Sequence, residues 1–244
     1  MSDVLGQAML DYLANQHEEN ITVQSPDFDD DVIPVEYLFR SFREMPILEQ
    51  KALELAKGET LDVGCGAGSH AHYLATEKNL NVTAIDTSPG AVEVCRLRGI
   101  KQARVIDFYD LESAPCDTIL MLMNGTGIMK NLAYAEAFFT QLKRLLSPAG
   151  QVLIDSSDLR YLFDENEDGG IWIDASQGYY GELTYRMKYK HLQTDWFDWL
   201  YLDYASLEDL ANTFGFNCEL VQEGAHFDYL ARLTLSPHTP QSGD

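Results

Sequence analysis

The sequence predicts an α/β fold, in which helices cover both faces of a mostly parallel β-sheet. Five short apolar segments alternate with helical patterns or helix-length gaps, as expected for parallel strands joined by crossover helices. Each segment ends at, or is followed by, a polar residue, which a buried core does not require. Because ligands of such sheets bind outside the carboxyl ends of the strands, these residues mark the predicted site. They are Asp62, Asp86, Asp107, Asn124 and Asp155.

Residues 1–57 are predicted to form a helical cover over the sheet. Apolar residues at helical spacing indicate an amphipathic helix over residues 4–15. Residues 25–34 hold four aspartates between two prolines and are predicted to be a loop. Two more helices are expected over residues 35–45 and 46–57, because the proline between them suits the first turn of a helix and ends the preceding one.

Residues 58–155 contain the alternation that predicts the sheet. The pair Ser88-Pro89 is a strong helix start, since serine caps a helix and proline fits its first position. Gly99 then ends that helix. The expected strands are residues 61–63, 81–85, 103–106, 118–123 and 151–154, and the expected helices are residues 69–78, 88–99 and 134–146.

Residues 156–205 interrupt the alternation and are predicted to be an inserted β-hairpin with a flexible loop. The loop is the acidic segment 164–170. In residues 183–190 apolar and polar side chains alternate, as in a strand with one buried face. Residues 196–203 are the expected partner strand.

Residues 206–235 are predicted to complete the core. A helix is expected to start at a capping box formed by Ser206 and Asp209, and two closing strands follow at residues 218–221 and 229–235. Residues 236–244 are polar with two prolines and are predicted to be a disordered tail. Together these parts are expected to form one structural domain.

The composition excludes several classes of partner. The net charge of −22 arises from acids along the whole chain, without a lysine and arginine cluster that could neutralise phosphates. Nucleic acid is therefore not an expected partner. No apolar run reaches the roughly 20 residues needed to span a bilayer, and the N-terminus lacks the pattern of a secretory signal. The four separated cysteines favour reduced core thiols. A cytoplasmic protein is expected.

The segment Thr60–His70 reads Thr-Leu-Asp-Val-Gly-Cys-Gly-Ala-Gly-Ser-His and has the character of a nucleotide-binding turn. A dinucleotide fingerprint would need its third glycine at the position of Ser69, where the glycine instead comes one residue early. A phosphate-binding P-loop would need a lysine that this segment lacks.

The arrangement D-x-G-x-G-x-G, followed by acids after successive strands, resembles the class I S-adenosylmethionine-dependent methyltransferases. The resemblance covers residues 60–155, and the closing helix and strands follow in the family's order. It implies a Rossmann-like fold with a mostly parallel seven-stranded sheet and S-adenosylmethionine as the cofactor.

The resemblance also implies roles for individual residues. Asp62 with Gly64, Gly66 and Gly68 corresponds to the family's first motif, where the backbone meets the methionine part of the cofactor. Asp86 corresponds to the acid that accepts both ribose hydroxyls, for which a carboxylate has the two oxygens required. Asp107 and Phe108 match the adenine position, and Asn124 matches the position facing the sulfonium and the acceptor.

A methyltransferase of this type would act on a small-molecule acceptor by in-line transfer, which mainly needs the acceptor atom held near attack distance. A base is required when the acceptor is a hydroxyl or a protonated amine. The N-terminal helices and the insertion usually build the acceptor pocket in this family. The candidate catalytic residues are therefore Tyr37, Asn124, Asp158, Tyr179 and Tyr180.

Other side chains are not expected to take part in the chemistry. His70 and His72 are interpreted as surface or packing residues. No metal requirement is predicted, because Asn124 stands where metal-dependent members carry an acid. The aspartates at residues 27–31 lack the turning glycine of a cation-binding loop.

Two alternatives remain open from the sequence. The protein could be a protein methyltransferase, or a cofactor-binding protein that acts through its aromatic hairpin at residues 183–203. It could instead be a nicotinamide-dependent oxidoreductase, against which the displaced third glycine argues.

Overall fold

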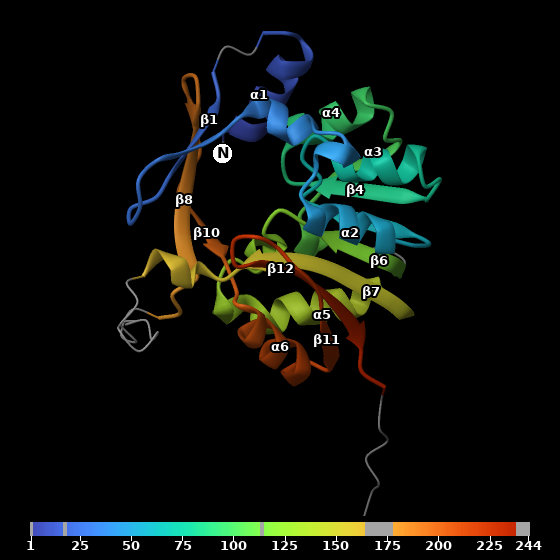
Figure 1. Cartoon of the computed structure of the whole chain (residues 1–244). Helices are drawn as coiled ribbons and strands as arrows, with labels where there is room; N and C mark the ends of the chain where they lie inside the picture. Colours follow the sequence, from blue (N-terminus) through green and yellow to red (C-terminus); the bar gives the residue numbers. More distant parts are fainter. Residues whose placement is uncertain (1, 17–18, 113–114, 164–177, 238–244) are drawn as a thin grey trace, which may run out of the picture.

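The computed structural model describes residues 2–16, 19–112, 115–163 and 178–237. In this part of the chain, seven strands form one sheet in the order β11-β12-β7-β6-β3-β4-β5 (Figure 1). The strands from β7 to β5 run parallel, and β11 and β12 are antiparallel, which confirms the predicted mostly parallel sheet. The strands are β3 (Thr60–Val63), β4 (Val82–Asp86), β5 (Gln102–Val105), β6 (Cys116–Met121), β7 (Leu146–Ser157), β11 (Phe216–Glu223) and β12 (Asp228–Leu235).

Helices cover both faces of this sheet, as the apolar strands require. On one face lie α2 (Ile47–Leu55), α3 (Ser69–Thr76) and α4 (Pro89–Leu97), whose apolar side chains share a buried cluster with β4 and β6. On the other face lie α5 (Ala135–Leu145) and α6 (Tyr204–Thr213), which pack with β7, β11 and β12. The carboxyl ends of the parallel strands carry the residues of the predicted site.

Helix α1 (Val4–Leu13) is anchored to the start of α4. Asp3 caps α1 by accepting from the N–H of Gly6 over 2.9 Å, and it also accepts from Ser88 Oγ over 2.6 Å and from the N–H of Gly90 over 2.7 Å. A Cβ at Gly90 would lie 2.6 Å from Gly6 Cα, so the two glycines allow the helices to touch. Helix α1 therefore packs against the start of α4.

A second, smaller sheet faces the carboxyl edge of the first and is called the cover sheet below. Its order is β10-β8-β1-β2, with β9 paired to β8. Figure 1 shows β1, β8 and β10 standing beside the core. The strands are β1 (Ile21–Gln24), β2 (Asp31–Ile33), β8 (Glu182–Tyr189), β9 (Leu192–Gln193) and β10 (Phe197–Leu200).

The cover sheet confirms the predicted hairpin but corrects the purely helical cover. Residues 31–33 lie in the predicted loop, yet they form β2, and β1 pairs with β8 through Val23 and Met187. These strands have only three or four residues. Pairing with a strand far away in the sequence defines them, and no local pattern carries that information.

Three further local expectations differ from the structure. Residues 35–45 form two 3₁₀ helices, η1 (Val35–Phe39) and η2 (Phe42–Glu44), because Arg40 and Ser41 are extended, with ψ of 144° and 165°. Helix α6 is capped by Asp203, which accepts from the N–H of Ser206 over 2.9 Å, rather than by Ser206. The residues between the expected helix 134–146 and the expected strand 151–154 belong to β7 itself.

Some expectations fall outside the described residues. The acidic loop 164–170 and residues 238–244 of the predicted tail are among them. Within the described ranges, every helix is too short or too polar to cross a membrane.

Candidate functional site

The glycine turn follows β3 and passes over the end of β4. The N–H groups of Gly64 and Cys65 donate to the carbonyl of Ile85 over 2.9 and 3.0 Å. The N–H of Gly66 donates to Asp86 Oδ2 over 3.0 Å. Gly66 has a φ of +52°, and a Cβ there would meet nothing within 4 Å. Its backbone therefore borders open space at the strand ends, as the sequence predicts.

Gly68 has a different role from Gly66. Its φ is +75°, and a Cβ there would lie 2.4 Å from Ile100 Cδ1 and 2.7 Å from Cys95 Sγ. This glycine lets the start of α3 pack closely against α4. A direct contact of Gly68 with a ligand stays a prediction.

Alanine at these two positions is expected to separate strain from packing. Both Gly66→Ala and Gly68→Ala place a Cβ on left-handed backbone, at a cost of about 1–2 kcal/mol. Gly68→Ala also forces its Cβ into Cys95 and Ile100, which adds roughly 1–3 kcal/mol. In urea unfolding, the midpoint of Gly68→Ala should therefore be clearly lower than that of Gly66→Ala. Equal unfolding midpoints would contradict the packing role of Gly68.

Asp86 ends β4 and is held by the turns on either side of it. Its Oδ2 accepts from Gly66, and its Oδ1 accepts from the N–H of Ser88 over 2.8 Å. Burial raises the pKa of this carboxyl, against the effect of the backbone hydrogen bonds. A carboxylate has two oxygens that can each accept from more than one donor, so Asp86 can also accept from a ligand.

Asp107 and Phe108 follow β5, where the sequence places them. Asp107 caps η3 (Phe108–Asp110) by accepting from the N–H of Tyr109 over 3.0 Å. The Phe108 side chain is 4% exposed and packs against Phe138, with ring centroids 5.7 Å apart. Phe108 therefore belongs to the core, and contact between its ring and a ligand stays a prediction.

Two buried polar atoms near the glycine turn lack a hydrogen-bond partner among the described residues. One is an acceptor, Asp62 Oδ2, and the other is a donor, Arg40 Nε. Both side chains are nearly inaccessible, with exposures of 2% for Asp62 and 7% for Arg40. Burial raises the pKa of Asp62. Unpaired buried polar groups are costly, so each of these two atoms is a candidate for a ligand contact.

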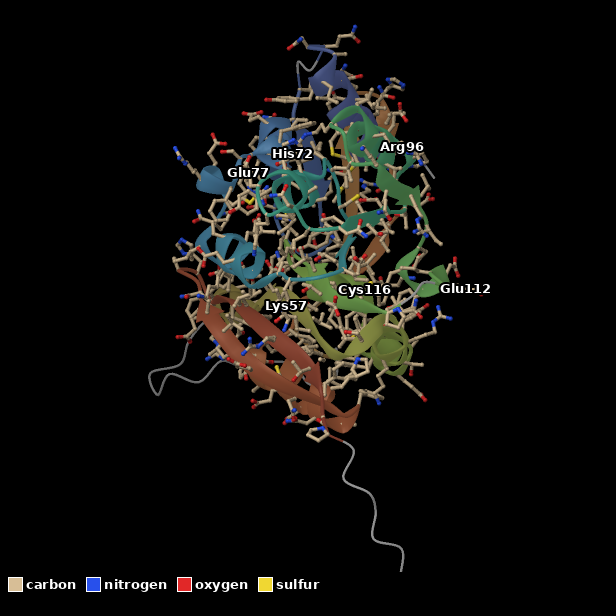
Figure 2. All side chains as sticks on the ribbon, turned by 90° about the vertical axis from the view of Figure 1, so that its right-hand side faces the viewer. Lys57, His72, Glu77, Arg96, Glu112 and Cys116 are labelled. Atoms are coloured by element: carbon tan, nitrogen blue, oxygen red, sulfur yellow. The ribbon has the colours of Figure 1, made fainter. Side chains whose placement is uncertain are left out.

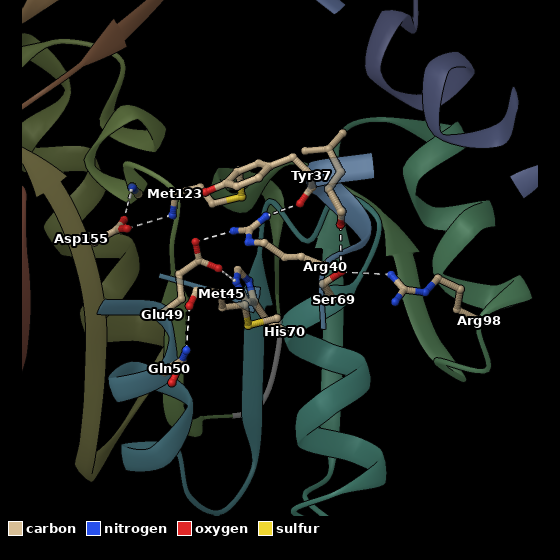
Figure 3. A network of polar contacts seen from close by, with 12 residues as sticks. Tyr37, Arg40, Met45, Glu49, Gln50, Ser69, His70, Arg98, Met123 and Asp155 are labelled. Carbon is tan, nitrogen blue, oxygen red and sulfur yellow. Dashed lines mark hydrogen bonds and ion pairs between the residues drawn. The ribbon is translucent and has the colours of Figure 1, made fainter. Parts of the chain in front are cut away.

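Arg40 is part of a buried charged network, drawn in Figure 3. Its Nη2 is ion-paired with Glu49 Oε1, and His70 Nε2 donates to Glu49 Oε2 over 2.6 Å. Arg40 Nη1 also donates to the carbonyl of Tyr37 over 2.6 Å. Burial opposes the imidazolium of His70, but the bond to Glu49 and the charge of Asp62 outweigh it and raise its pKa. The interpretation of His70 as a surface or packing residue misses this ion pair.

Asp155 holds a strained turn after β6. Its two oxygens accept from the N–H groups of Met123 over 3.1 Å and Gly125 over 3.0 Å. Met123 and Asn124 both have left-handed backbone, with φ of 67° and 61°, a conformation that non-glycine residues adopt mainly where their surroundings enforce it. This turn starts η4 (Gly125–Met129). Asn124 Oδ1 accepts from Ser157 Oγ over 3.0 Å, so Asn124 contacts the end of β7.

Stability is expected to depend on pH through Asp155, because burial raises the pKa of its carboxyl to about 6. A carboxyl with a raised folded pKa favours the fold below its ordinary pKa near 4 and loses that contribution as pH rises through 6. In Asp155→Asn the contribution is absent at every pH. The unfolding free energy of the variant relative to the wild type should thus increase by about 3 kcal/mol between pH 4 and 7. Parallel pH curves from urea unfolding would contradict this assignment.

Three of the predicted acceptor residues come together beyond β7. The Tyr180 hydroxyl donates to Asp158 Oδ1 over 2.7 Å, and the Tyr179 hydroxyl donates to Asp203 Oδ2 over 2.7 Å. The two tyrosine rings are in contact, with centroids 4.7 Å apart. Asp158 also forms an ion pair with Arg160. Burial raises the pKa of Tyr179 to about 12, so its hydroxyl stays protonated at neutral pH.

Tyr37 reaches the same region from the N-terminal cover. It is 40% exposed, and Figure 3 shows its hydroxyl end beside Met123. Burial raises the pKa of Tyr37, and the charges of Glu49 and Asp155 add to this effect. Tyr37 therefore lies beside Met123, the residue before Asn124 (Figure 3). Ser157, which donates to Asn124, directly precedes Asp158 in the chain.

The cover sheet adds aromatic side chains that the sequence analysis did not single out. Tyr185 lies opposite Phe197 and Leu183 lies opposite Trp199, so these four side chains share one face. That face is directed at η4, since a Cβ at Gly127 would lie 2.0 Å from Trp199 Cε2.

Other polar residues lie away from this region. Figure 2 shows His72, Glu77 and Arg96 at the outer surface of the helix layer. The four cysteines form no disulfide, as expected, although Cys65 Sγ lies 3.6 Å from Cys95 Sγ. Within the described part of the chain, no group of three or more histidine, cysteine or acidic side chains could hold a metal ion.

Comparison with known proteins identifies the family. A family model described as a methyltransferase domain matches residues 61–154. The crystal structure of an S-adenosylmethionine-dependent methyltransferase from Bacteroides fragilis, in complex with S-adenosyl-L-homocysteine, is 48% identical and superimposes with a TM-score of 0.88. The match covers 96% of this chain and 95% of that one. The chain belongs to the class I S-adenosylmethionine-dependent methyltransferases. This membership replaces the nicotinamide-dependent alternative.

More distant members of the family match only in part. The ubiquinone biosynthesis O-methyltransferase of Xylella fastidiosa is 29% identical over 114 residues, which are 43% of this chain and 44% of that protein. The chain thus spans less than half the length of this curated relative. A methyltransferase structure from Clostridium acetobutylicum, 13% identical with a TM-score of 0.56, covers 80% of this chain and 94% of its own and shares the fold.

For a methyltransferase of this class, the buried charges around Glu49 are the main feature that the sequence analysis missed. Arg40 and Glu49 lie in segments that the sequence predicts as helices, where charged residues usually face solvent. Of these residues, only His70 could have been linked to the site from the sequence, because it follows the glycine turn directly.

Proposed function

We propose that the protein transfers a methyl group from S-adenosylmethionine to a small-molecule acceptor. The observation that carries this proposal is the pair of buried unpartnered atoms, Asp62 Oδ2 and Arg40 Nε. The methionine part of the cofactor ends in an ammonium and a carboxylate, which would supply a donor for Asp62 and an acceptor for Arg40. Both atoms gain the partner that their burial demands.

The remaining cofactor contacts follow the strand ends. Asp86 would accept the ribose hydroxyls with its two carboxylate oxygens. Gly64 and Gly66 leave the backbone open to the ligand, and Gly68 fixes the start of α3. Asp107 would lie at the adenine. Asn124 would face the sulfonium from its left-handed turn.

Asp158 and Tyr180 are the residues best placed to handle a proton. When bound, the cofactor supplies an electrophilic methyl group on its sulfonium sulfur. A hydroxyl acceptor would lose its proton as its oxygen bonds to the methyl carbon and the carbon–sulfur bond breaks, releasing S-adenosylhomocysteine. An ammonium acceptor would have to lose a proton first, because its nitrogen has no lone pair with which to attack. Asp158 would accept the proton, directly or through the Tyr180 hydroxyl that already donates to it. Tyr37, Tyr179 and Asn124 would orient the acceptor.

The chemistry of the cover sheet supports an uncharged or cationic acceptor with an apolar or aromatic body. Its face toward η4 presents Tyr185, Phe197 and Trp199, whereas Arg186 and Lys188 alternate onto the opposite face. No strand residue on the first face would pair with a phosphate or carboxylate. The partial match with an O-methyltransferase makes an aromatic hydroxyl the first acceptor class to examine.

Incubation with S-adenosylmethionine deuterated in its methyl group tests the proposal. Small aromatic hydroxyl compounds and amines should gain a deuterated methyl group in mass spectra, while phosphorylated or carboxylated analogues should not. Asp86→Ala serves as the inactive control. Transfer to none of the panel, by a protein that binds S-adenosylhomocysteine, would argue against a small-molecule acceptor and direct attention to protein substrates.

We also infer a cytoplasmic location without a nucleic-acid partner. Free cysteines and a net charge of −22 support this inference.

A further inference from the structure

Glu49 joins segments that are far apart in the sequence. It lies in the first turn of α2 and is 3% exposed. Both of its carboxylate oxygens are engaged, one by Arg40 and the other by His70. Arg40 lies between η1 and η2 of the N-terminal cover, and His70 lies in the first turn of α3, directly after the glycine turn. Glu49 thus ties the cover to the helix that starts at the proposed cofactor site (Figure 3).

Arg40 carries this connection on to Tyr37. Its guanidinium carbon lies 4.1 Å from the centre of the Tyr37 ring, and Nη1 donates to the Tyr37 carbonyl. Because Nη2 donates to Glu49 and Nη1 donates to the Tyr37 carbonyl, the plane of the guanidinium is fixed by two contacts. The unpartnered Nε therefore has one orientation. Because the fork is planar, a change in the Glu49 contact would move Nε and the Tyr37 ring together.

Stability alone is a weak explanation for such a network. Removing a carboxylate, a guanidinium and an imidazole from water costs several kcal/mol per ion, and apolar side chains of similar size often serve a fold as well. The groups facing His70 are Glu49 from α2, Asp62 from β3, Arg40 from the cover and Asp155 from β7. Asp62 and Asp155 lie near the carboxyl ends of β3 and β7.

We propose that Glu49 and His70 are positioning residues that hold Arg40, and through it Tyr37, so that cofactor binding and placement of the N-terminal cover are coupled. This inference rests on the proposed function. Neither Glu49 nor His70 needs to touch the cofactor. Their contribution is to fix Arg40 Nε for the carboxylate of the cofactor and to keep residues 35–45 closed over it.

Glu49→Gln tests the coupling with little change in shape. Glutamine can still accept from Arg40, but its NH₂ group replaces the oxygen that accepts from His70, and the negative charge is lost. Hydrogen bonds to charged groups contribute about 1.5–3 kcal/mol, so the affinity for S-adenosylhomocysteine measured by calorimetry should fall by roughly tenfold or more. In hydrogen exchange with this ligand, residues 35–45 should lose their ligand-induced protection, while residues 62–68 should keep theirs.

Glu44→Gln is the matched control, because Glu44 caps η2 through Ser41 in the same cover but is fully exposed. The affinity of Glu44→Gln for S-adenosylhomocysteine should stay within about twofold of the wild type, since Glu44 is hydrogen-bonded to Ser41 and not to Arg40, Glu49 or His70. His70→Asn removes the bond to Glu49 from the histidine side and should reproduce the effect of Glu49→Gln. It keeps the inference testable if Glu49→Gln folds poorly.

Wild-type affinity and normal protection of residues 35–45 in both network variants would overturn the inference. Equal loss of protection over residues 35–45 and 62–68 would also overturn it, because that would indicate a general loss of fold. Failure of the proposed function has a different signature, since the wild-type protein would then bind no S-adenosylhomocysteine.

Discussion

Asp86→Ala is expected to raise the dissociation constant for S-adenosylhomocysteine by at least about a hundredfold. Each hydrogen bond between a ribose hydroxyl and a carboxylate contributes about 1.5–3 kcal/mol, and two such bonds correspond to factors of roughly 10² to 10⁴. The substitution also removes the acceptor that orients the N–H of Gly66. Titration calorimetry of the variant against the wild type measures the effect.

Asp117→Ala provides the control for this prediction. Asp117 also accepts a hydrogen bond from a backbone N–H, that of Glu59, over 3.0 Å. However, it lies at the start of β6, at the opposite end of the strands from Asp86. The affinity of the Asp117→Ala protein for S-adenosylhomocysteine should equal that of the wild type. An Asp86→Ala protein that binds as tightly as the wild type would rule out Asp86 as the ribose acceptor.

Arg40→Leu is expected to cause the largest loss of stability, about 3–5 kcal/mol, because it leaves the buried Glu49 without its main partner. For a chain of this size the melting temperature should fall by roughly 6 to 20 °C. Thermal unfolding by circular dichroism measures the shift. Replacing both partners, in Arg40→Leu with Glu49→Leu, should recover much of the loss, because no uncompensated carboxylate then remains in the pair.

A surface ion pair supplies the comparison. Arg232 and Glu219 form a pair across β11 and β12 in which both side chains are substantially exposed, 32% and 58%. Arg232→Leu should therefore cost less than about 1 kcal/mol. Similar melting temperatures for Arg40→Leu and Arg232→Leu would show that the Glu49 network does not stabilise the fold.

Local sequence patterns were sufficient for the central sheet and for the positions of Asp86 and Asp107 in the fold. The apolar segments that became β3, β4 and β6 are buried on both faces, and such strands appear as continuous apolar runs. Asp86 and Asp107 lie at or just after strand ends, as predicted, because the end of a strand fixes where the following residues lie. The helix start at Ser88 was found because its cap is local, and Ser88 Oγ does accept from the N–H of Ala91 over 2.9 Å.

Features that depend on distant contacts were not predictable in this way. Residues 35–45 have a helical composition, but the contacts of Arg40 with Glu49 and Tyr37 hold the chain extended in the middle of the segment. Strand β1 exists because β8, about 160 residues later, pairs with it. Asp203 took the cap expected for Ser206 because Tyr179 and Ser206 both donate to it.

The left-handed turn at Met123 and Asn124 lies between these two cases. The sequence identified Asn124 from its place after a strand, but not the backbone conformation that aims it. That conformation depends on Asp155, which comes from the neighbouring strand and accepts from both ends of the turn. The sequence identified both residues, but it gave no indication that one holds the other.

A crystal structure of the protein with S-adenosylhomocysteine tests the central claim most directly. The account predicts the ligand ammonium within hydrogen-bond distance of Asp62 Oδ2, its carboxylate on Arg40 Nε, and its ribose hydroxyls on Asp86. A complex in which Asp62 Oδ2 and Arg40 Nε remain without ligand contacts, or in which the ribose lies away from Asp86, would contradict it.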